Sequence, residues 1–386
     1  MEYQMHKRKP LVIIDTFHLL TAFTGIKTYT SILCEHTIGR DDLKATYISI
    51  PFWKRADNST FLKGKLNFLQ KIISHSGFII WKLGVLPLVL LFKRADAVIA
   101  PDYVLPIRFN KCLGLTVFHD TLYWEYKENY NRLWRWYYTK MAEKLLGKYS
   151  VIVATSAYTR QKISSLISDT QPMSIIYQSF KPLNKMATSE SILDKFKVQP
   201  FKYFLHVGTF DKRKNLSTLI RAFKIFINKY GSRDYKLVLA GARGVAKNHD
   251  DYDVLVSTIK IENMEGQVIL PGFVDNEELA SLYKYANAYV FPSIEEGFGI
   301  PILEAMSLDV PVIVSNKGSL QEIAGEAALV FDAKNADMLA DQLHQIQQPE
   351  IRNTLIEKGK ARVTKFSIEY FIQNFDELIY QQLNKK

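Results

Sequence analysis

Two glutamates separated by seven residues, Glu296 and Glu304, enclose a glycine-rich turn in the second half of the chain. The turn contains Gly297 and Gly299, and Pro301 follows where a helix can begin, because its fixed φ suits the first helical turn. Helix N-termini attract anions, and a carboxylate accepts hydrogen bonds from paired hydroxyls such as those of sugars and ribose. The pattern predicts a ligand lying against the backbone with one carboxylate at each end. The simpler interpretation is a helix with an acidic N-terminus.

A second candidate is a basic loop that follows the strand-like segment 203–208. Arg213 and Lys214 stand just before Asn215, which is well placed to cap a helix. Basic side chains at a helix N-terminus oppose the helix dipole, so this pair predicts an anion between them, most simply a diphosphate. A solvated run of charges is the alternative.

The first half offers weaker candidates. His119 and Asp120 follow a strand-like run, where a histidine could act as acid or base, donate to a substrate, or serve only the structure. Gly25 precedes a predicted helix and could present backbone amides to a phosphate, but a single glycine is a weak signal.

These residues must be positioned by a repeated pattern of strand and helix. Apolar runs without period-2 alternation are typical of strands covered on both faces, and amphipathic segments such as 216–230 and 276–286 lie between them. The predicted strands are 11–15, 95–101, 115–120, 151–156, 203–208, 236–241, 268–273, 288–293 and 310–315. The pattern predicts two doubly wound α/β domains, whose ligands bind beyond the carboxyl ends of the strands.

The chain has 386 residues, of which 47% are hydrophobic and 23% charged, and this composition excludes disorder as the main state. We expect residues 1–180 to form the first domain, together with a final helix over 368–386. Residues 181–367 are expected to form the second. The two cysteines are too few to staple such a chain and fit a reducing compartment.

Charge is distributed unevenly along the chain. Residues 1–200 carry 28 Lys or Arg and 15 Asp or Glu, whereas residues 201–386 carry 22 and 24. A basic half implies an anionic partner such as phosphate groups, a membrane surface or nucleic acid. The most apolar run, residues 78–92, is interrupted by Lys82 and Pro87 and is shorter than the ~20 residues that a spanning helix needs. We expect it to be a buried or semi-buried helix and strand, with a lipid-touching surface as the alternative.

The second half also resembles a known family. The strings VGTFDKRKNLSTLIRAF, KLVLAG and ILPGFVDNEELASLYKYANAYVFPSIEEGFGIPILEAMSLDVPVIVS resemble, in order and spacing, the retaining glycosyltransferases of family 4, within the glycosyl transferases group 1. The first half matches more loosely, through TGIKTYT, APDYVLP, VFHDTLYWE and TSAYTRQKIS. The resemblance implies the GT-B fold: two Rossmann-like domains facing across a cleft, with the last helix crossing back to the first domain.

The resemblance also implies residue roles. The first domain would lie on the acceptor side and the second would bind the donor. Lys214 would bind the donor diphosphate, Glu296 and His119 would contact the donor sugar, and these three are the expected catalytic residues. The expected donor-binding residues are Gly25, Thr209, Arg213, Gly272, Phe273, Gly297, Phe298, Gly299, Ile300 and Glu304, of which Glu304 would hold the ribose. Thr209 departs from the family, which often has Arg there, and Arg213 is the candidate replacement.

The implied function is a retaining, metal-independent hexosyltransferase. It would move a sugar from a UDP- or GDP-linked donor to a saccharide or lipid-linked acceptor, in polysaccharide or glycolipid biosynthesis. We expect no cofactor and no metal, since the formal Asp-x-Asp motif at 251–253 lies far from the nearest strand end. We expect a cytoplasmic protein, peripheral on the inner membrane face, without nucleic-acid partners. The alternatives are an epimerase or phosphorylase on the same fold, or a non-catalytic binder of anionic surfaces.

Overall fold

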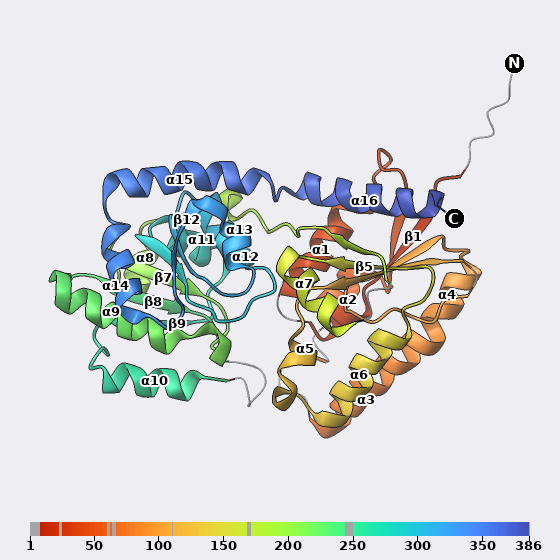
Figure 1. The fold of residues 1–386 in the computed structure, drawn as a ribbon, viewed down its shortest axis with the longest axis horizontal. Coiled ribbons are helices and arrows are strands. Elements are labelled where there is room, and N and C mark those ends of the chain that lie inside the picture. The colour runs from red at the N-terminus through yellow and green to blue at the C-terminus, as the bar shows by residue number, and fades with distance from the viewer. Residues whose placement is uncertain are drawn as a thin grey trace, which may run out of the picture. The chain divides into compact units, whose positions relative to one another are not determined.

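The computed structural model describes residues 8–22, 25–59, 62–63, 67–109, 111–167, 171–243 and 250–385. The chain divides into two compact units (Figure 1). Unit 1 comprises Met1–Phe180 and Ser367–Lys386, and unit 2 comprises Lys181–Phe366. Each unit is built on a six-stranded parallel sheet, as expected from strands that lack alternation.

Unit 1 has the strand order β2-β1-β3-β4-β5-β6. Its strands are β1 (Leu11–Asp15), β2 (Thr46–Ile50), β3 (Ala97–Ala100), β4 (Leu113–Phe118), β5 (Ser150–Ala154) and β6 (Met173–Ile175). The order changes direction between β1 and β3, which makes this pair the topological switch point where open α/β sheets bind ligands.

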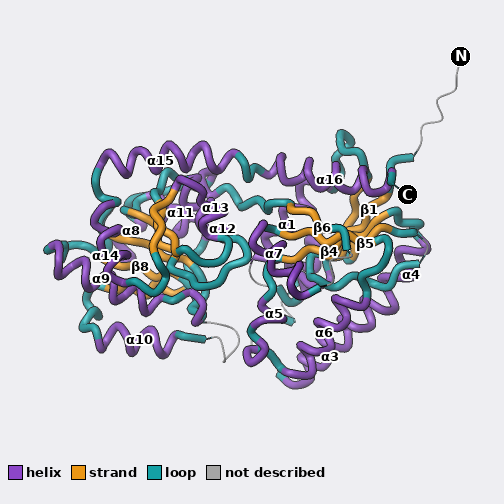
Figure 2. Tube along the Cα trace, in the orientation of Figure 1, coloured by secondary structure: helices purple, strands orange, loops and turns teal. Residues whose placement is uncertain are grey.

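Helices cover both faces of this sheet (Figure 2). They are α1 (Gly25–Thr37), α2 (Trp53–Asn58), α3 (Phe68–Ile80), α4 (Leu86–Phe92), α5 (Leu122–Glu125), α6 (Arg132–Lys144), α7 (Ala157–Leu166) and α16 (Ile368–Asn384). The last helix, α16, belongs to unit 1 because Phe371, Phe375 and Ile379 enter the core formed with β1, β3, β4 and β5. Asp376 of α16 also accepts hydrogen bonds from the Lys44 amide at 2.7 Å and the Tyr47 hydroxyl at 2.9 Å.

Unit 2 has the strand order β12-β11-β10-β7-β8-β9, with its switch point between β7 and β10. Its strands are β7 (Tyr203–Val207), β8 (Lys236–Ala240), β9 (Val268–Gly272), β10 (Ala288–Phe291), β11 (Val312–Ser315) and β12 (Ala328–Phe331). Its helices are α8 (Ile192–Phe196), α9 (Leu216–Tyr230), α10 (Tyr252–Ile261), α11 (Asn276–Lys284), α12 (Ile300–Ser307), α13 (Leu320–Ala324), α14 (Ala336–Gln345) and α15 (Pro349–Thr364). Two apolar cores, one on each face, hold this sheet between its helices.

The predicted strands are all present, but three observed strands were missed. They are β2, β6 and β12, and each lies at an edge of its sheet. In β2 (TYISI) and β6 (MSI) polar residues interrupt the apolar run, and β12 (ALVF) is a four-residue apolar run, too short to distinguish a strand from a buried helix. The fourth edge strand, β9, was predicted. Both cysteines, Cys34 and Cys112, are free and buried, so neither forms a disulfide.

Residues 78–92 form a semi-buried helix, as expected, with buried and exposed side chains mixed along it, but no strand. The segment is the second part of a longer continuous helix, Leu69–Phe92, of which only 28% of the most apolar window is buried. Among the described residues, this is one helix whose length and composition would allow it to cross a membrane. A five-residue π-helical turn, Trp81–Val85, joins α3 to α4 within it.

Candidate functional site

The two candidate loops of unit 2 meet at its switch point. Strands β7 and β10 pair directly in the sheet, with Phe204 opposite Ala288 and Leu205 opposite Tyr289. The basic loop follows β7 and the glycine-rich turn follows β10. Because adjacent parallel strands end at the same sheet edge, side chains from the two loops lie together.

Three charged side chains from these loops form a buried cluster. The Glu296 carboxylate oxygen Oε1 lies 2.6 Å from Arg213 Nη1 and 2.6 Å from Lys214 Nζ. The Ser293 hydroxyl also donates to Oε1, at 3.0 Å. Lys214 is 6% exposed, and its ammonium lies 4.6 Å from the centre of the Phe291 ring. Arg213, Lys214 and Glu296 together carry one net positive charge, which the Asp211 carboxylate, 3.7 Å from Arg213, offsets. In the structure the anion between the two cations is Glu296 itself.

The basic loop is held by backbone geometry. Lys212–Lys214 form a 3-10 turn in which the Lys214 amide donates to the Asp211 carbonyl at 2.8 Å. Asn215 then adopts φ 56° and makes no side-chain cap on α9, so the expected N-cap is wrong. Its side-chain amide instead donates to the Pro292 carbonyl at 3.1 Å and the Ala333 carbonyl at 2.8 Å. The amide oxygen of Asn215 accepts from the Thr218 hydroxyl of α9 at 2.7 Å, so this left-handed residue connects the start of α9 to both loops.

The glycine-rich turn is fixed by close backbone contacts. The Ser319 amide and hydroxyl both donate to the Glu296 carbonyl, at 3.0 and 3.1 Å, and the same hydroxyl donates to the Phe298 carbonyl at 2.8 Å. Gly318 has φ +62°, and a Cβ there would lie 2.6 Å from the Glu296 nitrogen. Only glycine allows this approach, so the backbone that carries Glu296 is positioned before any ligand binds.

The cluster shifts the acidity of its members. Burial alone would raise the pKa of Glu296, but Arg213 and Lys214 outweigh it and lower this pKa to about 2. Burial, with a smaller effect from Arg213, lowers the pKa of Lys214 below its usual value although Glu296 opposes the shift. The carboxylate is therefore firmly ionised at neutral pH, and Lys214 is a cation held in a largely dry place.

His206 belongs to this site and was not predicted from the sequence. It lies on β7, its Nδ1 is 3.0 Å from the Val290 carbonyl, and its buried Nε2 has no hydrogen-bond partner. A Cβ added at Gly208 would lie 3.6 Å from both His206 Nε2 and Lys214 Nζ, so the two side chains approach one another. Burial and Lys214 lower the pKa of His206 to about 3, so this imidazole is neutral. Only its position two residues before the strand-end glycine could have drawn attention to it.

Glu304 lies on α12, one element beyond the cluster. It is half-buried and accepts a hydrogen bond from the Tyr283 hydroxyl at 3.3 Å. Burial raises the pKa of Glu304 to about 7, against smaller opposing effects of Tyr283 and Lys181. Beyond the effect of burial, Glu304 and Glu296 both raise the pKa of the buried Tyr289 hydroxyl electrostatically. The two glutamates therefore flank a common region of unit 2.

Glycines line the sheet edge beside the cluster. Gly208, Gly241 and Gly272 follow or end the three neighbouring strands β7, β8 and β9. The Gly241 amide donates to the Gly272 carbonyl at 2.9 Å, and a Cβ on Gly241 would lie 1.7 Å from the Gly208 carbonyl oxygen. Phe273, next to Gly272, is 85% exposed. The carboxyl end of the sheet is therefore lined here by backbone and by one exposed aromatic ring. Such a surface can accommodate a flat ring system.

The remaining donor-side predictions fall on the same loops. Thr209 donates to the Asp211 carboxylate at 2.7 Å. Gly299, with φ +111°, precedes Ile300, the first residue of α12. Gly297 is half-buried, and Phe298 is buried with its ring 5.8 Å from that of Phe366. The Phe298 side chain is therefore a packing group.

Gly25 and His119 belong to unit 1. Gly25 is the first residue of α1. The His119 nitrogen Nε2 lies 2.9 Å from the Pro101 carbonyl, and its ring stands edge-on to Tyr29 of α1 at 4.7 Å. Burial lowers the pKa of His119 to about 4, so its ring is neutral at pH 7.

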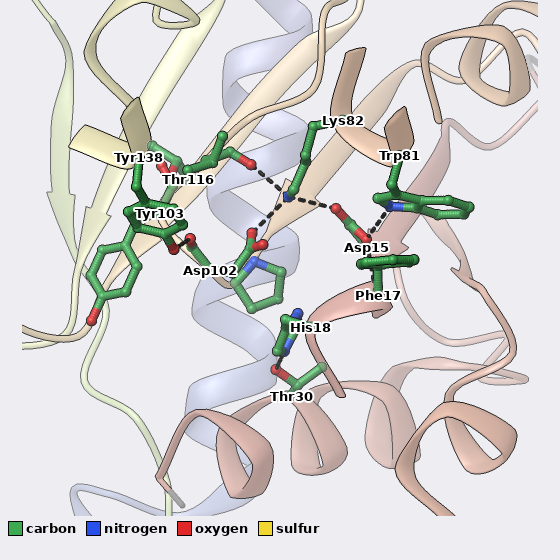
Figure 3. A network of polar contacts seen from close by, with 12 residues as sticks. Asp15, Phe17, His18, Thr30, Trp81, Lys82, Asp102, Tyr103, Thr116 and Tyr138 are labelled. Carbon is green, nitrogen blue, oxygen red and sulfur yellow. Dashed lines mark hydrogen bonds and ion pairs between the residues drawn. The ribbon is translucent and has the colours of Figure 1, made fainter. Parts of the chain in front are cut away.

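Unit 1 holds a buried charge cluster of its own that the sequence did not predict (Figure 3). Lys82, in the π-helical turn, is 0% exposed and donates to Asp15 at 2.6 Å, Asp102 at 2.7 Å and the Val104 carbonyl at 2.6 Å. The Trp81 indole donates to the other Asp15 oxygen at 2.9 Å. Asp15 ends β1 and Asp102 follows β3, so this cluster lies at the switch point of the first sheet. In the sequence, Lys82 was only an interruption of an apolar run.

The acidic motif at 251–253 shows no metal-binding geometry. Asp253 is paired with Arg243 at 2.8 Å, and Asp251 precedes α10. Across the described ranges, which omit 244–249, no group of three His, Cys, Asp or Glu could hold a metal ion.

Comparison with known proteins gives a consistent result. Residues 189–362 match the family model of the glycosyl transferases group 1. The chain is 31% identical over 274 residues to O-antigen chain mannosyltransferase B of Escherichia coli, with 70% of each protein covered. It is 26% identical over 291 residues to O-antigen chain mannosyltransferase RfbU of Salmonella typhimurium, covering 75% of this chain and 73% of that protein.

Solved structures share the fold across nearly the whole chain. A sucrose-phosphate synthase from Thermosynechococcus elongatus superposes with a TM-score of 0.73 at 20% identity, covering 98% of this chain and all of that one. HepE from Anabaena, solved in complex with UDP and glucose, superposes with a TM-score of 0.70 at 15% identity, covering 97% and 100%. At these identities the likeness concerns the fold.

Proposed function

Since the chain belongs to the group 1 glycosyltransferases and has the GT-B fold, we propose that it transfers a hexose from a nucleotide diphosphate sugar to a saccharide or lipid-linked acceptor. Mannose is the proposed hexose and surface polysaccharide the proposed product, because two relatives are named O-antigen chain mannosyltransferases. The proposed compartment is the cytoplasm. The reaction is proposed to retain the anomeric configuration and to need no metal.

One observation carries the proposal: Arg213 and Lys214 converge on a single point at the switch point of unit 2. A diphosphate carries more negative charge than a carboxylate and can accept from both cations at once. A donor entering this site would compete with Glu296 for them. Released from the cations, the Glu296 carboxylate could accept hydrogen bonds from the hydroxyls of the donor sugar.

The other donor contacts follow from the chain's own geometry. Glu304 would accept from the two ribose hydroxyls once ionised, and the Gly272–Phe273 edge would border the base. In the reaction, the bond between the anomeric carbon and the leaving phosphate oxygen breaks. The acceptor oxygen bonds to that carbon and loses its proton. Arg213 and Lys214 would stabilise the charge that develops on the leaving diphosphate, the role that a metal fills elsewhere. The role of His119 at the donor sugar stays a prediction.

The test is product analysis with the purified full chain. We expect GDP-mannose or another donor from a UDP- and GDP-sugar panel to yield free nucleoside diphosphate and a new glycoside. Anomeric coupling constants in the product would report retention or inversion. An altered sugar nucleotide would instead indicate an epimerase, and a free sugar phosphate a phosphorylase.

A matched pair of variants assigns the activity to this cluster. Glu296→Gln removes the carboxylate charge at the cluster, whereas Glu295→Gln makes the same change one residue away. We expect the first to lose transfer and the second to keep it. Equal activity in both, with intact folding, would contradict the proposed site.

A further inference from the structure

The helix Leu69–Phe92 of unit 1 exposes an unusually large apolar surface. Its exposed apolar side chains recur every three or four residues and so form one face, which we name the apolar ridge. The apolar ridge consists of Leu69, Ile72, Ile73, Ile80, Leu83, Val85, Leu88, Leu91 and Phe92. Soluble proteins rarely expose so many contiguous apolar side chains without a partner.

The neighbouring helix α6 also exposes apolar side chains. It packs against α3, since the Trp134 ring lies 3.9 Å from His75 and 5.8 Å from Phe78 (Figure 1). Its exposed apolar side chains are Leu133 and Trp136. Tryptophan is the residue that favours the boundary between lipid tails and headgroups.

Basic residues predominate around the apolar ridge. Besides the buried Lys82, residues 58–95 contain five Lys or Arg and no Asp or Glu. At the end of α4, a cavity of about 650 Å³ has apolar walls that include Leu91 and Phe109 and a lining that includes Arg8, Arg94 and Lys111. Asp96 is the one acidic residue that lines it. A surface that combines exposed aliphatic groups with basic groups complements an anionic phospholipid layer.

The ion pairs of Lys82, drawn in Figure 3, limit how this helix can contact a membrane. Lys82 projects from the opposite side of the helix and is held by Asp15 and Asp102. Leu86 and Leu90 pack beside it into the core with β1 and β3. To span a bilayer the helix would have to leave these partners and carry the Lys82 charge into lipid. The helix is therefore fastened to unit 1 by one face and presents the other.

We propose that the apolar ridge is a membrane-docking surface, which lies in the headgroup layer of an anionic phospholipid bilayer without crossing it. The basic groups around the cavity at the end of α4 contact lipid phosphates, and the aliphatic side chains enter the boundary with the acyl chains. The proposal stands on unit 1 alone and does not depend on the sugar that unit 2 binds.

The test is co-sedimentation of the purified full chain with vesicles of phosphatidylcholine, with and without phosphatidylglycerol. We expect binding to the anionic vesicles that weakens as salt rises from about 0.1 to about 0.5 M. The double variant Ile80→Glu with Leu88→Glu alters side chains that are 61% and 50% exposed, so folding is preserved. We expect its vesicle binding to fall at least about tenfold.

The matched control is Val254→Glu with Ile261→Glu on α10 of unit 2. These side chains are 52% and 75% exposed, and the change in charge is the same. We expect this control to bind vesicles like the wild type. Equal binding by both double variants, or no binding by the wild type, would overturn the proposal.

Two further outcomes would also overturn it. Light scattering that shows a dimer, broken by Ile80→Glu with Leu88→Glu, would assign the apolar ridge to a second copy of the chain. Resistance of the membrane-bound protein to carbonate extraction would indicate a spanning helix. Sugar-nucleotide affinity, measured on the same variants, should stay unchanged, which separates this surface from the function proposed for unit 2.

Discussion

Unit 1 and unit 2 each place three buried charges at the switch point of a parallel sheet, with the signs reversed. In unit 1 one cation, Lys82, lies between two carboxylates, Asp15 and Asp102. In unit 2 one carboxylate, Glu296, lies between two cations, Arg213 and Lys214. The three central side chains therefore sum to one negative charge in unit 1 and one positive charge in unit 2, where Asp211 lies 3.7 Å from Arg213 as well.

The reversal explains opposite shifts in acidity. Burial raises the pKa of Asp102 to about 6, because Lys82 is shared with Asp15 and offsets burial only in part. Burial acts on Glu296 in the same direction, yet two cations lower its pKa to about 2. The count of neighbouring charges decides the sign where burial is similar.

The two clusters also differ in whether they can bind a ligand. All three donors of the Lys82 ammonium are used, by two carboxylates and the Val104 carbonyl, so this cluster has no donor left for a ligand. In the unit 2 cluster two cations share a single carboxylate oxygen, Glu296 Oε1, and the cluster lies beside strand-end glycines. We therefore assign anchoring to the first and anion binding to the second.

The largest expected effect is on the stability of unit 1. Lys82→Met leaves two buried carboxylates without their cation, and breaking such a buried pair costs about 3–5 kcal/mol of unfolding free energy. All five tryptophans lie in unit 1, so denaturant unfolding followed by tryptophan fluorescence reports this unit. The control Lys71→Met, at an exposed lysine of α3, should unfold like the wild type. Identical curves for the two variants would remove the anchoring role.

The next effect is on turnover. Lys214→Met removes a donor to the developing charge of the leaving group, so we expect kcat to fall about 10²–10³-fold. Lys212→Met, at the exposed lysine two residues earlier, serves as the control and should keep normal turnover. The measurement is the initial rate of nucleoside diphosphate release with the donor found in the panel. A similar loss of turnover in both variants would show that the overall positive charge of the loop matters, and not the contacts of Lys214 in the cluster.

A smaller effect concerns stability against pH. Because the pKa of Asp102 is raised in the folded chain, its protonated form favours folding, and that stability is lost as pH rises from about 4 through about 6. Asp102→Asn mimics the protonated form. The unfolding free energy of the variant, relative to that of the wild type, should therefore rise by about 1 kcal/mol or more as pH increases over this range. Fluorescence-detected unfolding at pH 4 and pH 7 measures the gap. If the difference in unfolding free energy between variant and wild type stays constant or becomes smaller as pH rises, the pKa of Asp102 is not raised in the folded chain.

For Glu296 the contribution to the unfolding free energy changes with pH in the opposite direction. Its lowered pKa gives stability that is present above its unfolded value near pH 4.5 and lost as pH falls through about 2. Since unit 2 contains no tryptophan, circular dichroism is the probe that includes it.

The smallest effect concerns nucleotide affinity. With the pKa of Glu304 near 7, the carboxylate that would hold the ribose is mostly protonated at pH 6 and mostly ionised at pH 8. We expect a sugar nucleotide to bind up to about tenfold more weakly at pH 6 than at pH 8. Glu304→Gln should bind weakly at both values and lose the dependence, as calorimetry would show. A dependence that survives in the variant would exclude Glu304 as its source.

Much of the fold could be predicted from the sequence because central strands and amphipathic helices leave periodic signals. The runs 11–15 and 203–208 and the helix 216–230 correspond to β1, β7 and α9. The edge strands β2 and β12 were missed, because polar residues interrupt the apolar run of β2 and the apolar run of β12 has only four residues.

The sequence predicted several residues of the candidate site, but not the contacts between them. Spacing and resemblance indicated Lys214, Glu296 and Glu304, whereas the ion pair between Lys214 and Glu296 joins residues 82 positions apart in sequence and depends on strand order. Lys82 was missed for the same reason, since its partners come from β1 and from the residues after β3. The left-handed backbone of Asn215 likewise arises from the tertiary contact between two loops.

Arg213 and Lys214 are proposed to bind a diphosphate, which competes with Glu296 for these two cations. Calorimetric titration of UDP and GDP into the wild type, Lys214→Met and Glu296→Gln tests it directly. We expect Lys214→Met to bind at least about tenfold more weakly, because a charge-assisted contact is lost. Glu296→Gln should bind at least as tightly as the wild type, because its cations are no longer neutralised. Wild-type affinity in Lys214→Met, or equal losses in both variants, would contradict the account.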